Sequence, residues 1–328
     1  MTPSIPRALI GITALFALAA HAEDSYKFSG TLDLGYYKDF DGNTKTGSIS
    51  RSNIAFDANK DLSGGMALTG KINTRVRLRN PDTRENFVNE DPKYFGSGEA
   101  TVGLKDSQWG HVRFGRAITA LWNNDWAYDA WYNYDSIASP AWWLWHGNSP
   151  ADPNASTKGA SFARLNNGVF YTSPNFNGFS VDASYGIQTQ DKDRNHSTSV
   201  ALKYDQKDYG ALFAHEKTPA GNTVNFLAGK VNFGALSVMA GYDDEKLQNG
   251  KANRSYSASA RYTDGAMSYL AGVGVQRDYG NAKFYSAGLS YAYKPNLNIY
   301  GSYGNQGKGL WGSTSAKDAL GVGVNYSF

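Results

Sequence analysis

Polar and apolar residues alternate along most of this chain, in stretches of about ten residues. The clearest stretch runs from Lys71 to Arg79, where Lys, Asn and Arg occupy every second place and apolar residues or Thr lie between them. Successive side chains of a β-strand face opposite sides, so this pattern predicts a strand with one polar and one apolar face. The same alternation opens the chain at 25–38 and closes it at 317–328.

The alternation recurs sixteen times, and each stretch is predicted to be a strand. The predicted strands are 25–38, 48–59, 66–80, 98–106, 109–117, 160–173, 178–188, 196–206, 208–217, 222–233, 235–244, 253–263, 267–277, 281–293, 296–305 and 317–328. Short turns, such as 106–108 and 294–296, alternate with longer loops, such as 39–47 and 81–97. Tight turns alternating with long loops are typical of an up-and-down antiparallel sheet that closes on itself.

The composition of the two strand faces distinguishes a membrane barrel from a soluble sandwich. One face is rich in Arg, Asp, Asn and Gly, whereas the other carries Leu, Val, Ile, Tyr and Phe. A soluble sandwich of this size would bury large apolar side chains on its inner faces and expose polar ones. Aromatic residues also gather at strand ends, where they would meet the boundary between lipid and water. Examples are Tyr36, Tyr171, Tyr185, Tyr204, Tyr262, Tyr291 and Tyr326.

These features predict an all-β protein, a transmembrane antiparallel β-barrel of 16 strands that occupies residues 23–328. Closure removes the open strand edges that lipid does not tolerate. Sixteen strands leave an aqueous lumen, because the barrel is too wide for side chains to fill. The chain has no run of 18 apolar residues, so no helical membrane span is expected.

The first 22 residues are predicted to be a cleaved signal peptide. Arg7 supplies the positive charge, 8–20 is a short apolar core, and Ala20-His21-Ala22 is a small-x-small cleavage pattern. Removal of Arg7 leaves 31 basic residues (32 − 1) against 29 acidic ones, a net charge of +2. A net charge this close to zero argues against a nucleic-acid partner. The absence of Cys is compatible with export to an oxidising compartment.

One long segment, from Leu121 to Ala160, has neither a strand nor a helix period. It carries six of the eight tryptophans, Trp122, Trp126, Trp131, Trp142, Trp143 and Trp145, and its first part also carries Asp125, Asp129 and Asp135. A loop of this length inside a compact domain is usually functional. So much aromatic area is expected to be buried against something, so the loop is predicted to fold back onto the strands.

Short segments spread over the whole mature chain carry a family resemblance. They are SGTLD at 29–33, SR at 50–51 with NIAF at 53–56, DLSGGM at 61–66, VGLK at 102–105 and WGHVRFGR at 109–116. In this order they resemble the general, trimeric outer-membrane porins of Gram-negative bacteria, of the proteobacterial type. The terminal Phe328, with apolar residues at every second place before it, is similar to the outer-membrane assembly signal. The Pro-Glu-Phe-Gly-Gly tip of the enteric porins is absent, and tryptophans occupy that region instead.

The resemblance implies that the third loop, about 118–160, folds into the lumen and narrows it. Asp125, Asp129 and Asp135 would then face a row of wall cations, for which the candidates are Arg51, Arg75, Arg77, Arg113 and Arg116. Opposed charges across a narrow aqueous gap orient and sort solutes. Because the arginines outnumber the aspartates, the prediction is passive diffusion of ions and small hydrophilic solutes with a weak anion preference.

The resemblance also implies the surroundings of the barrel. The expected partners are outer-membrane lipid and lipopolysaccharide, two further copies in a homotrimer, and the barrel-assembly machinery, which would contact the C-terminal strand ending in Phe328. No metal and no cofactor are expected.

Several alternatives stay open from the residues alone. Each Arg could be a solvated wall residue, and the aspartates could cap turns inside the loop. Arg113 and Arg116 are three positions apart and face opposite ways unless the strand bends at Gly115. Trp122, Trp126 and Trp131 could pack the loop, form interface belts or stack on a sugar, which would make a sugar-selective porin.

Two other classes of barrel fit the sequence less well. An outer-membrane enzyme is disfavoured because no Gly-x-Ser-x-Gly, His-Glu-x-x-His or P-loop motif is present. A plugged structural or adhesion barrel is disfavoured by the many charges predicted to face the lumen.

Overall fold

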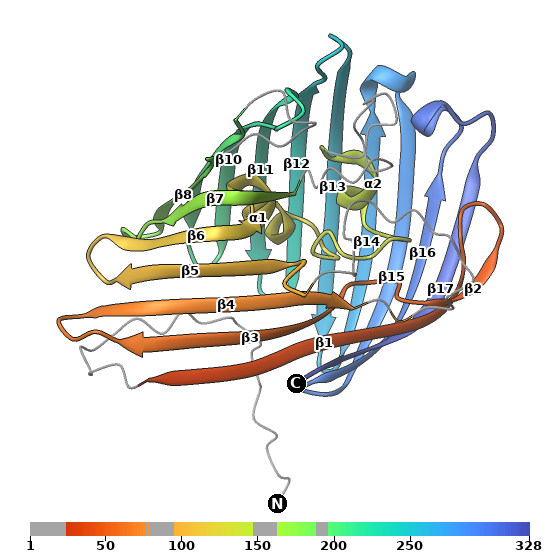
Figure 1. Ribbon diagram of the computed structural model, residues 1–328. Helices are drawn as coiled ribbons and strands as arrows, with labels where there is room; N and C mark the ends of the chain where they lie inside the picture. Colours follow the sequence, from red (N-terminus) through yellow and green to blue (C-terminus); the bar gives the residue numbers. More distant parts are fainter. Residues whose placement is uncertain (1–23, 77, 79–94, 147–162, 188–195) are drawn as a thin grey trace, which may run out of the picture.

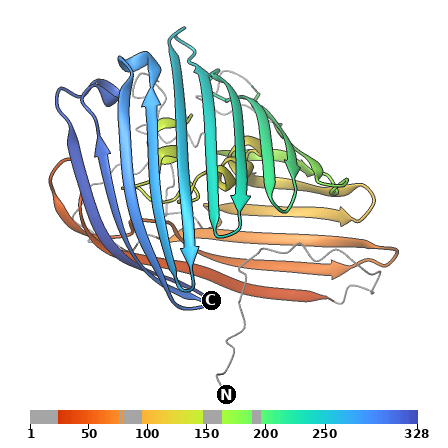
Figure 2. The same cartoon turned by 180° about the vertical axis from the view of Figure 1, so that it is seen from behind.

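The computed structural model describes residues 24–76, 78, 95–146, 163–187 and 196–328. These residues form one antiparallel sheet of seventeen strand segments, which closes because β1 pairs with β17 (Figures 1 and 2). The segments in the first half are β1 (Ser25–Lys38), β2 (Thr44–Gly47), β3 (Ser52–Asp61), β4 (Met66–Val76), β5 (Glu99–Asp106), β6 (Gly110–Ile118), β7 (Arg164–Thr172) and β8 (Phe179–Gly186). Those in the second half are β9 (Thr198–Asp205), β10 (Tyr209–Lys217), β11 (Thr223–Phe233), β12 (Leu236–Lys246), β13 (Ala252–Asp264), β14 (Met267–Gln276), β15 (Ala282–Lys294), β16 (Leu297–Gln306) and β17 (Lys317–Ser327).

The predicted strand 48–59 begins later than expected, as β3 at Ser52, and an additional short strand, β2 (Thr44–Gly47), lies in the predicted loop 39–47; β2 and β3 both pair with β1. Counted as one strand, they give the sixteen-stranded antiparallel barrel that the alternation predicts, and this prediction is confirmed. The interruption has a local cause in the buried carboxylate of Asp33. One of its oxygens accepts hydrogen bonds from the backbone N–H groups of Ile49 and Ser50, each at 2.8 Å. Those two groups are thereby taken out of the β-ladder.

The apolar face of the strands lies on the outside of the barrel. On β17, Leu320, Val322 and Val324 are exposed, whereas Ala319 on the other face is buried. On β4, Leu68 and Ile72 are exposed in the same way. An apolar outer surface around a polar lumen is the arrangement that a lipid environment requires.

The two ends of the barrel differ in their connections. One end has the short links 62–65, 107–109, 206–208, 234–235, 265–266 and 295–296. The long connections are at the other end, and two of them contain single helical turns, η2 (Arg277–Tyr279) and η3 (Leu310–Gly312). Among the described residues, no helix is long and apolar enough to cross a membrane.

The connection after β6 turns into the barrel instead of extending outwards (Figure 1). Its described part contains α1 (Ala120–Asn124), η1 (Asp125–Tyr128) and α2 (Pro140–Leu144). We call residues 119–146 the inner segment. The predicted signal peptide, 1–22, and the remainder of the predicted loop, 147–160, lie outside the described residues.

Candidate functional site inside the barrel

The inner segment begins with two backbone hydrogen bonds to the barrel wall. The N–H of Ala120 donates to Ser184 Oγ on β8 at 3.2 Å, and the N–H of Leu121 donates to Ser199 Oγ on β9 at 3.0 Å. The first N–H groups of a helix have no partner within the helix, so serines on the wall take the place of a capping residue. The start of α1 is thereby fixed to β8 and β9.

Strand β13 holds the middle and the end of the segment. Ser259 Oγ accepts from the N–H of Ala130 at 2.9 Å, and Ser255 Oγ donates to the carbonyl oxygen of Leu144 at 2.8 Å. Ser255 and Ser259 are four residues apart, so they lie on the same face of β13. Their contacts with the inner segment show that this face lines the lumen. The polar inner face therefore satisfies backbone groups that would otherwise be buried without partners.

Glycines on the inner face make room for two of the tryptophan rings. A Cβ atom at Gly272 would lie 2.9 Å from the ring of Trp131, and one at Gly241 would lie 2.9 Å from the ring of Trp145. Both indoles are buried, and the Trp145 ring also meets Phe226 edge-on, with 4.7 Å between the centroids. These two rings pack the segment against the wall.

The loop aspartates do not form an acidic row facing water. Asp129 is buried, and its Oδ2 accepts from the N–H groups of Trp131 and Asn133 at 3.1 and 3.0 Å and from Ser139 Oγ at 2.9 Å. This carboxylate shapes a turn in which Tyr132 and Asn133 both adopt the left-handed conformation, with φ of 57° and 54°. Burial raises the pKa of Asp129 to about 6, although these hydrogen bonds favour its ionised form.

Asp135 is also engaged within the fold, although it borders the cavity described below. Its Oδ1 accepts from the N–H groups of Ile137 and Ala138, each at 2.8 Å, and Ser302 on β16 donates to its Oδ2. Burial raises the pKa of Asp135 to about 6. The expectation of an open acidic row is therefore corrected for Asp125 and Asp129, which are buried and do not border the cavity, whereas Asp135 borders it with its oxygens bound to the segment and to the wall.

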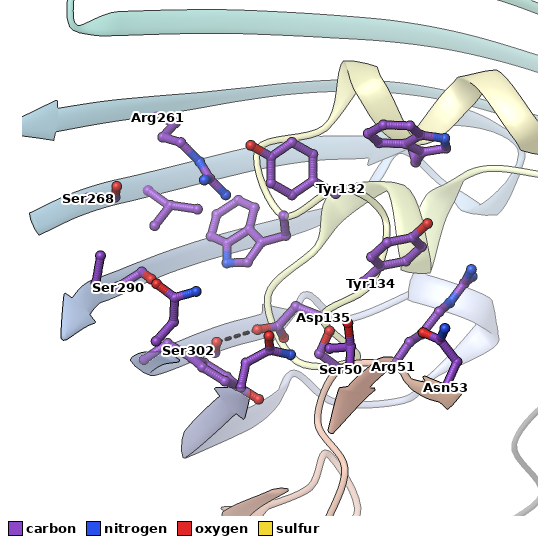
Figure 3. A pocket seen from close by; sticks show the side chains of 18 of the residues that line it. Ser50, Arg51, Asn53, Tyr132, Tyr134, Asp135, Arg261, Ser268, Ser290 and Ser302 are labelled. Atoms are coloured by element: carbon purple, nitrogen blue, oxygen red, sulfur yellow. Dashed lines mark hydrogen bonds between the residues drawn. The ribbon is translucent and has the colours of Figure 1, made fainter. Parts of the chain in front are cut away.

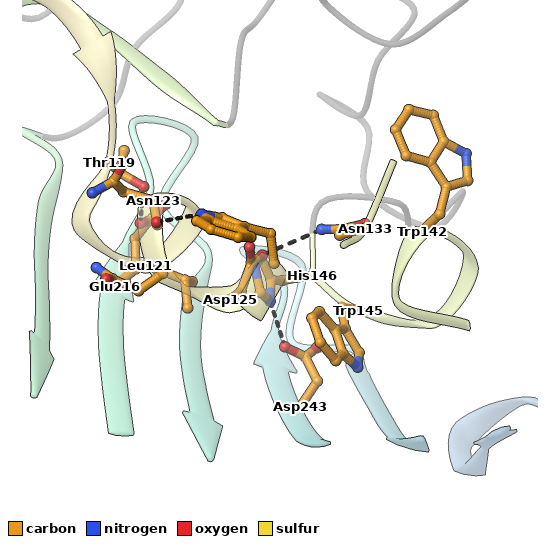
Figure 4. Close-up of polar contacts among 12 residues, drawn as sticks. Thr119, Leu121, Asn123, Asp125, Asn133, Trp142, Trp145, His146, Glu216 and Asp243 are labelled. Atoms are coloured by element: carbon orange, nitrogen blue, oxygen red, sulfur yellow. Dashed lines mark hydrogen bonds and ion pairs between the residues drawn. The ribbon is translucent and has the colours of Figure 1, made fainter. Parts of the chain in front are cut away.

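The third aspartate belongs to a buried ionic cluster at the end of the segment (Figure 4). His146 Nε2 lies 3.2 Å from Asp125 Oδ2, and His146 Nδ1 lies 2.6 Å from Asp243 Oδ1 on β12. Burial opposes the charged imidazole, but the two carboxylates outweigh that effect and raise the pKa of His146 to about 10. The cluster therefore fixes the last described turn of the segment to β12.

Beside the inner segment lies a cavity of about 1080 Å³ (Figure 3). Cationic side chains from four parts of the barrel wall border it: Arg51, Lys71, Arg75, Arg164 and Arg261. Two acidic residues also border it, Glu99 and Asp135. Aromatic residues of the inner segment form the opposite side: Trp122, Trp126, Trp131, Tyr132 and Tyr134.

Both acidic residues of the cavity already have strong partners. Glu99 Oε1 lies 2.6 Å from Arg113 Nη1, and its Oε2 lies 3.8 Å from Lys71 Nζ. Asp135 accepts the three hydrogen bonds described above. Since five cations meet two engaged carboxylates, the field in the cavity is that of a net positive charge.

The predicted wall arginines divide into three groups. Arg51 and Arg75 border the cavity, as a pore-lining role requires. Arg77 lies outside the described residues. Arg113 and Arg116 do not border it, which corrects the expectation for these two.

Arg113 and Arg116 are held away from the cavity by different contacts. Arg113 faces the lumen but is paired with Glu99, and its guanidinium carbon lies 5.7 Å from the Phe170 ring centroid. Arg116 is opposite Ala100 in the ladder and donates from Nε to the carbonyl oxygen of Ser97 at 2.9 Å. Gly115 has a φ of 127°, and the register with β7 shifts after it, but this bend does not bring Arg116 to the cavity.

Three cations of the cavity were not selected from the sequence. Lys71 shares the polar face of its strand with Arg75, so the alternation itself could have included it. Arg261 continues the series Ser255, Ser257 and Ser259 on the inner face of β13. Arg164 has no such indication, because its orientation depends on a hydrogen bond from Nε to the carbonyl oxygen of Gly98 at 2.8 Å.

The tryptophans proposed for the constriction have two different environments. All three border the cavity, but Trp131 is buried, as described above, whereas Trp122 and Trp126 are half-buried. Trp122 meets His146 edge-on, with 4.7 Å between ring centroids, and Trp126 meets Tyr132 at 6.1 Å. The side of the segment that faces the cavity is therefore mainly aromatic, with Asp135 as an acidic residue there.

Phe328 lies at the closure of the barrel and does not itself border the cavity. It exchanges two backbone hydrogen bonds with Gly30, each of 3.0 Å. Its ring centroid is 5.7 Å from that of Phe28 and 6.0 Å from that of Tyr326. The last residue of the chain thus completes the seam between β1 and β17.

The sequence and the fold both match known proteins. A family model described as Gram-negative porin matches residues 8–309. An outer membrane porin protein of Bordetella pertussis is 21% identical over 359 aligned positions, which cover 96% of this chain and 88% of that protein.

Solved structures show the same barrel. The anion-selective porin from Comamonas acidovorans superposes with a TM-score of 0.73 at 18% identity, covering 93% of this chain and all of that one. OmpF of Salmonella typhi in complex with daunomycin gives a TM-score of 0.69 at 14% identity, covering 92% of this chain and 97% of that one. At these identities the structural matches establish the fold.

Proposed function

Because this chain belongs to the Gram-negative porin family and is a barrel of the outer membrane, we propose that it forms a channel for the passive diffusion of ions and small hydrophilic solutes, with a preference for anions. The family and the fold indicate a channel rather than an enzyme. The preference for anions rests on the cavity beside the inner segment.

One observation carries this proposal: five cationic side chains border the cavity, and the two acidic ones there are already engaged. Rings of Arg and Lys favour anions in a pore, because their positive charge attracts anions and repels cations. Arg keeps its charge at any working pH, so the preference would persist over a wide pH range. Charges more than about 8–10 Å away are screened at physiological salt, so the net charge of the whole chain matters little.

The burial of the loop aspartates supports the same conclusion. A transverse field needs acidic groups that face the water, and Asp125 and Asp129 do not border the cavity. The structural relative from Comamonas acidovorans is itself described as anion-selective. From the inner segment Asp135 also borders the cavity, but the five cations of the wall outnumber Asp135 and Glu99 together, so the cations dominate.

The proposal extends to assembly. Residues 1–22 would direct export and be removed, and the C-terminal strand ending in Phe328 would be recognised by the barrel-assembly machinery. The exposed apolar face would contact lipid and lipopolysaccharide, and three copies would form a homotrimer. Sizing of the detergent-solubilised protein before and after heating tests the trimer, because heat would convert it to monomer.

Ion substitution in planar bilayers tests the channel function. The purified protein is expected to give stable conductance steps in potassium chloride. Replacing chloride by the less mobile acetate is expected to lower the conductance more than replacing potassium by the less mobile lithium. The absence of steps would contradict the channel, and a larger effect of lithium would contradict the anion preference.

A further inference from the structure

Building on the proposed anion channel, we propose that the cavity beside the inner segment contains a binding site for aromatic carboxylates. Two arginine–tyrosine pairs would form it, Arg51 with Tyr134 and Arg261 with Tyr132. The site would slow and select planar aromatic anions among the solutes that the channel passes.

The two pairs have the same geometry and border the same cavity (Figure 3). The guanidinium carbon of Arg51 lies 4.3 Å from the centroid of the Tyr134 ring, and that of Arg261 lies 4.5 Å from the centroid of Tyr132. In each pair the arginine belongs to the barrel wall and the tyrosine to the inner segment. Wall and segment therefore meet in the lumen through charged aromatic contacts.

The fold holds Tyr132 in the lumen at a conformational cost. Its side chain is 42% exposed although its neighbours Ala130 and Trp131 are buried. Its φ of 57° is left-handed, a conformation that bulky residues rarely adopt. The buried carboxylate of Asp129, described above, holds this turn. Strained backbone of this kind is concentrated at functional sites, where the surrounding structure maintains it.

A guanidinium group that lies over an aromatic ring keeps its N–H edge available. Arg261 Nη2 donates to the carbonyl oxygen of Ala130, and Arg261 makes no other hydrogen bond to a described residue. Arg51 donates no side-chain hydrogen bond to a described residue; its guanidinium carbon also lies 5.8 Å from the Trp142 ring centroid. Nε of Arg261 is buried, so its Nη1 and the second N–H of Nη2, together with the donors of Arg51, are the groups that can bind a carboxylate in the plane of the guanidinium.

This geometry distinguishes aromatic from aliphatic carboxylates. In benzoate, the ring is conjugated with the carboxylate and lies in its plane. A benzoate held by Arg261 would therefore place its ring next to Tyr132, whose ring centroid lies 6.1 Å from that of Trp126. Aromatic pairs stabilise an arrangement beyond the area that they bury, whereas a puckered aliphatic ring of similar size gains only the ionic contact.

The acidic residues of the cavity would not compete for the arginines. Glu99 is bound to Arg113, and Asp135 is bound to Ser302 and to two backbone N–H groups. Small inorganic anions would experience the same positive charge but find no ring contact. The site is thus expected to bind aromatic carboxylates in preference to both other classes of anion.

Block of the chloride current in planar bilayers tests this inference. Benzoate and cyclohexanecarboxylate are added separately at pH 7, because both are fully ionised there and similar in size. The half-blocking concentration of benzoate is expected to be about fivefold lower, the order of one aromatic pair. Equal half-blocking concentrations, or no block by benzoate, would overturn the inference.

Two variants locate the site. Tyr132→Asn removes the ring and keeps a residue that tolerates a positive φ, and Arg261→Lys keeps the charge but removes the planar donor fork. Each is expected to bring the two half-blocking concentrations to within about twofold of each other. If both variants retain the full preference for benzoate, the site is not at this pair.

Two control variants show whether the effect is specific to the cavity, and a separate conductance measurement distinguishes failure of the binding site from failure of the channel. Tyr279 lies in η2, in an outer loop, and Arg254 lies near the start of β13. Neither residue borders the cavity, so Tyr279→Asn and Arg254→Lys are expected to retain the preference for benzoate. The conductance in potassium chloride alone reports on the channel itself. A conducting, anion-preferring channel without benzoate selectivity would overturn only the inference, whereas a protein without conductance would overturn the proposed function.

Discussion

The Nδ1 atom of His146 lies 2.6 Å from Oδ1 of Asp243, and this contact joins the end of the inner segment to strand β12. Neither residue is exposed, and Asp125 approaches the other imidazole nitrogen at 3.2 Å. A positive imidazolium between two carboxylates is the arrangement that makes such burial tolerable. The charge of this one histidine therefore holds the end of the segment to β12, in addition to the serine contacts elsewhere along it.

The pKa of His146 predicts how stability changes with pH. Since the pKa in the folded protein is about 10, above its ordinary value of 6.5, the protonated form is stabilised by folding. This contribution is fully present below about pH 6.5 and is lost as the pH rises through 10. We expect the heat-unfolding midpoint of the wild type, followed by circular dichroism, to decrease between pH 7 and 10.

The variant His146→Gln removes this dependence. Breaking a buried ion pair costs about 3–5 kcal/mol, so its midpoint at pH 6 is expected to be well below that of the wild type. The difference should narrow as the pH approaches 10. His215→Gln alters an exposed histidine that contacts Asn225 and is expected to follow the wild type. Parallel curves for wild type and His146→Gln would refute a charged His146.

The close approach between Gly272 and the inner segment predicts a steric effect on conductance. A Cβ atom at Gly272 would lie 2.6 Å from Pro140 Cγ and 2.9 Å from the Trp131 ring. We expect Gly272→Val to cost about 1–3 kcal/mol and to push the segment away from the wall into the lumen. Single-channel conductance should therefore fall.

A second glycine provides the control for this effect. A Cβ atom at Gly229 would meet only the backbone oxygen of Gly210, at an ordinary contact of 3.8 Å. Gly229→Val is expected to leave the single-channel conductance unchanged. An equal change in both variants would mean that the packing of Trp131 against Gly272 does not set the width of the channel.

The pairing of Arg113 with Glu99 predicts an indirect effect on selectivity. Although Arg113 does not border the cavity, Arg113→Gln would leave the Glu99 carboxylate without its guanidinium partner at the cavity surface. The zero-current potential in a salt gradient is then expected to shift towards cation preference. Arg116→Gln, which alters contacts to Ser97 and Asn166, should leave that potential unchanged. Identical potentials for Arg113→Gln and the wild type would show that Glu99 does not act on permeating ions.

The contacts of Phe328 predict a defect in assembly. Deleting this residue removes two backbone hydrogen bonds to Gly30 and the ring contact to Phe28. We expect a lower yield of folded, heat-modifiable barrel in the outer membrane, with export across the inner membrane intact. Phe176→Ala alters an exposed aromatic residue in a short turn and should leave the yield unchanged. A normal yield after deletion would argue against an assembly role for Phe328.

The strands and their two faces were predictable because a period of two residues is a local property of the sequence. Leu320, Val322 and Val324 are exposed to the outside as the alternation requires, and β1 and β13 begin and end within a residue of their predicted bounds. The break at 48–51 was not predictable in the same way. It depends on Asp33, which is distant in sequence and becomes a neighbour only when β1 pairs with β2 and β3.

The site itself was less predictable, because the inner segment has no regular period. Nothing in the sequence around Asp129 shows that its carboxylate binds Trp131 and Asn133 instead of facing water. Arg75 could be placed by alternation alone, whereas Arg164 depends on a contact with Gly98 across the wall. Alternation therefore gives the face on which a strand residue lies, whereas the contacts of a residue in the fold-back loop depend on parts of the chain that are distant in sequence.

The central claim is that cations of the barrel wall give the channel its preference for anions. Its most direct test is the zero-current potential across a planar bilayer with a tenfold gradient of potassium chloride. The wild type is expected to give the sign of a chloride-preferring channel, and the triple variant Arg51→Gln, Arg75→Gln and Arg261→Gln is expected to move the potential strongly towards potassium. A wild-type channel that prefers potassium, or a triple variant with an unchanged potential, would contradict the claim.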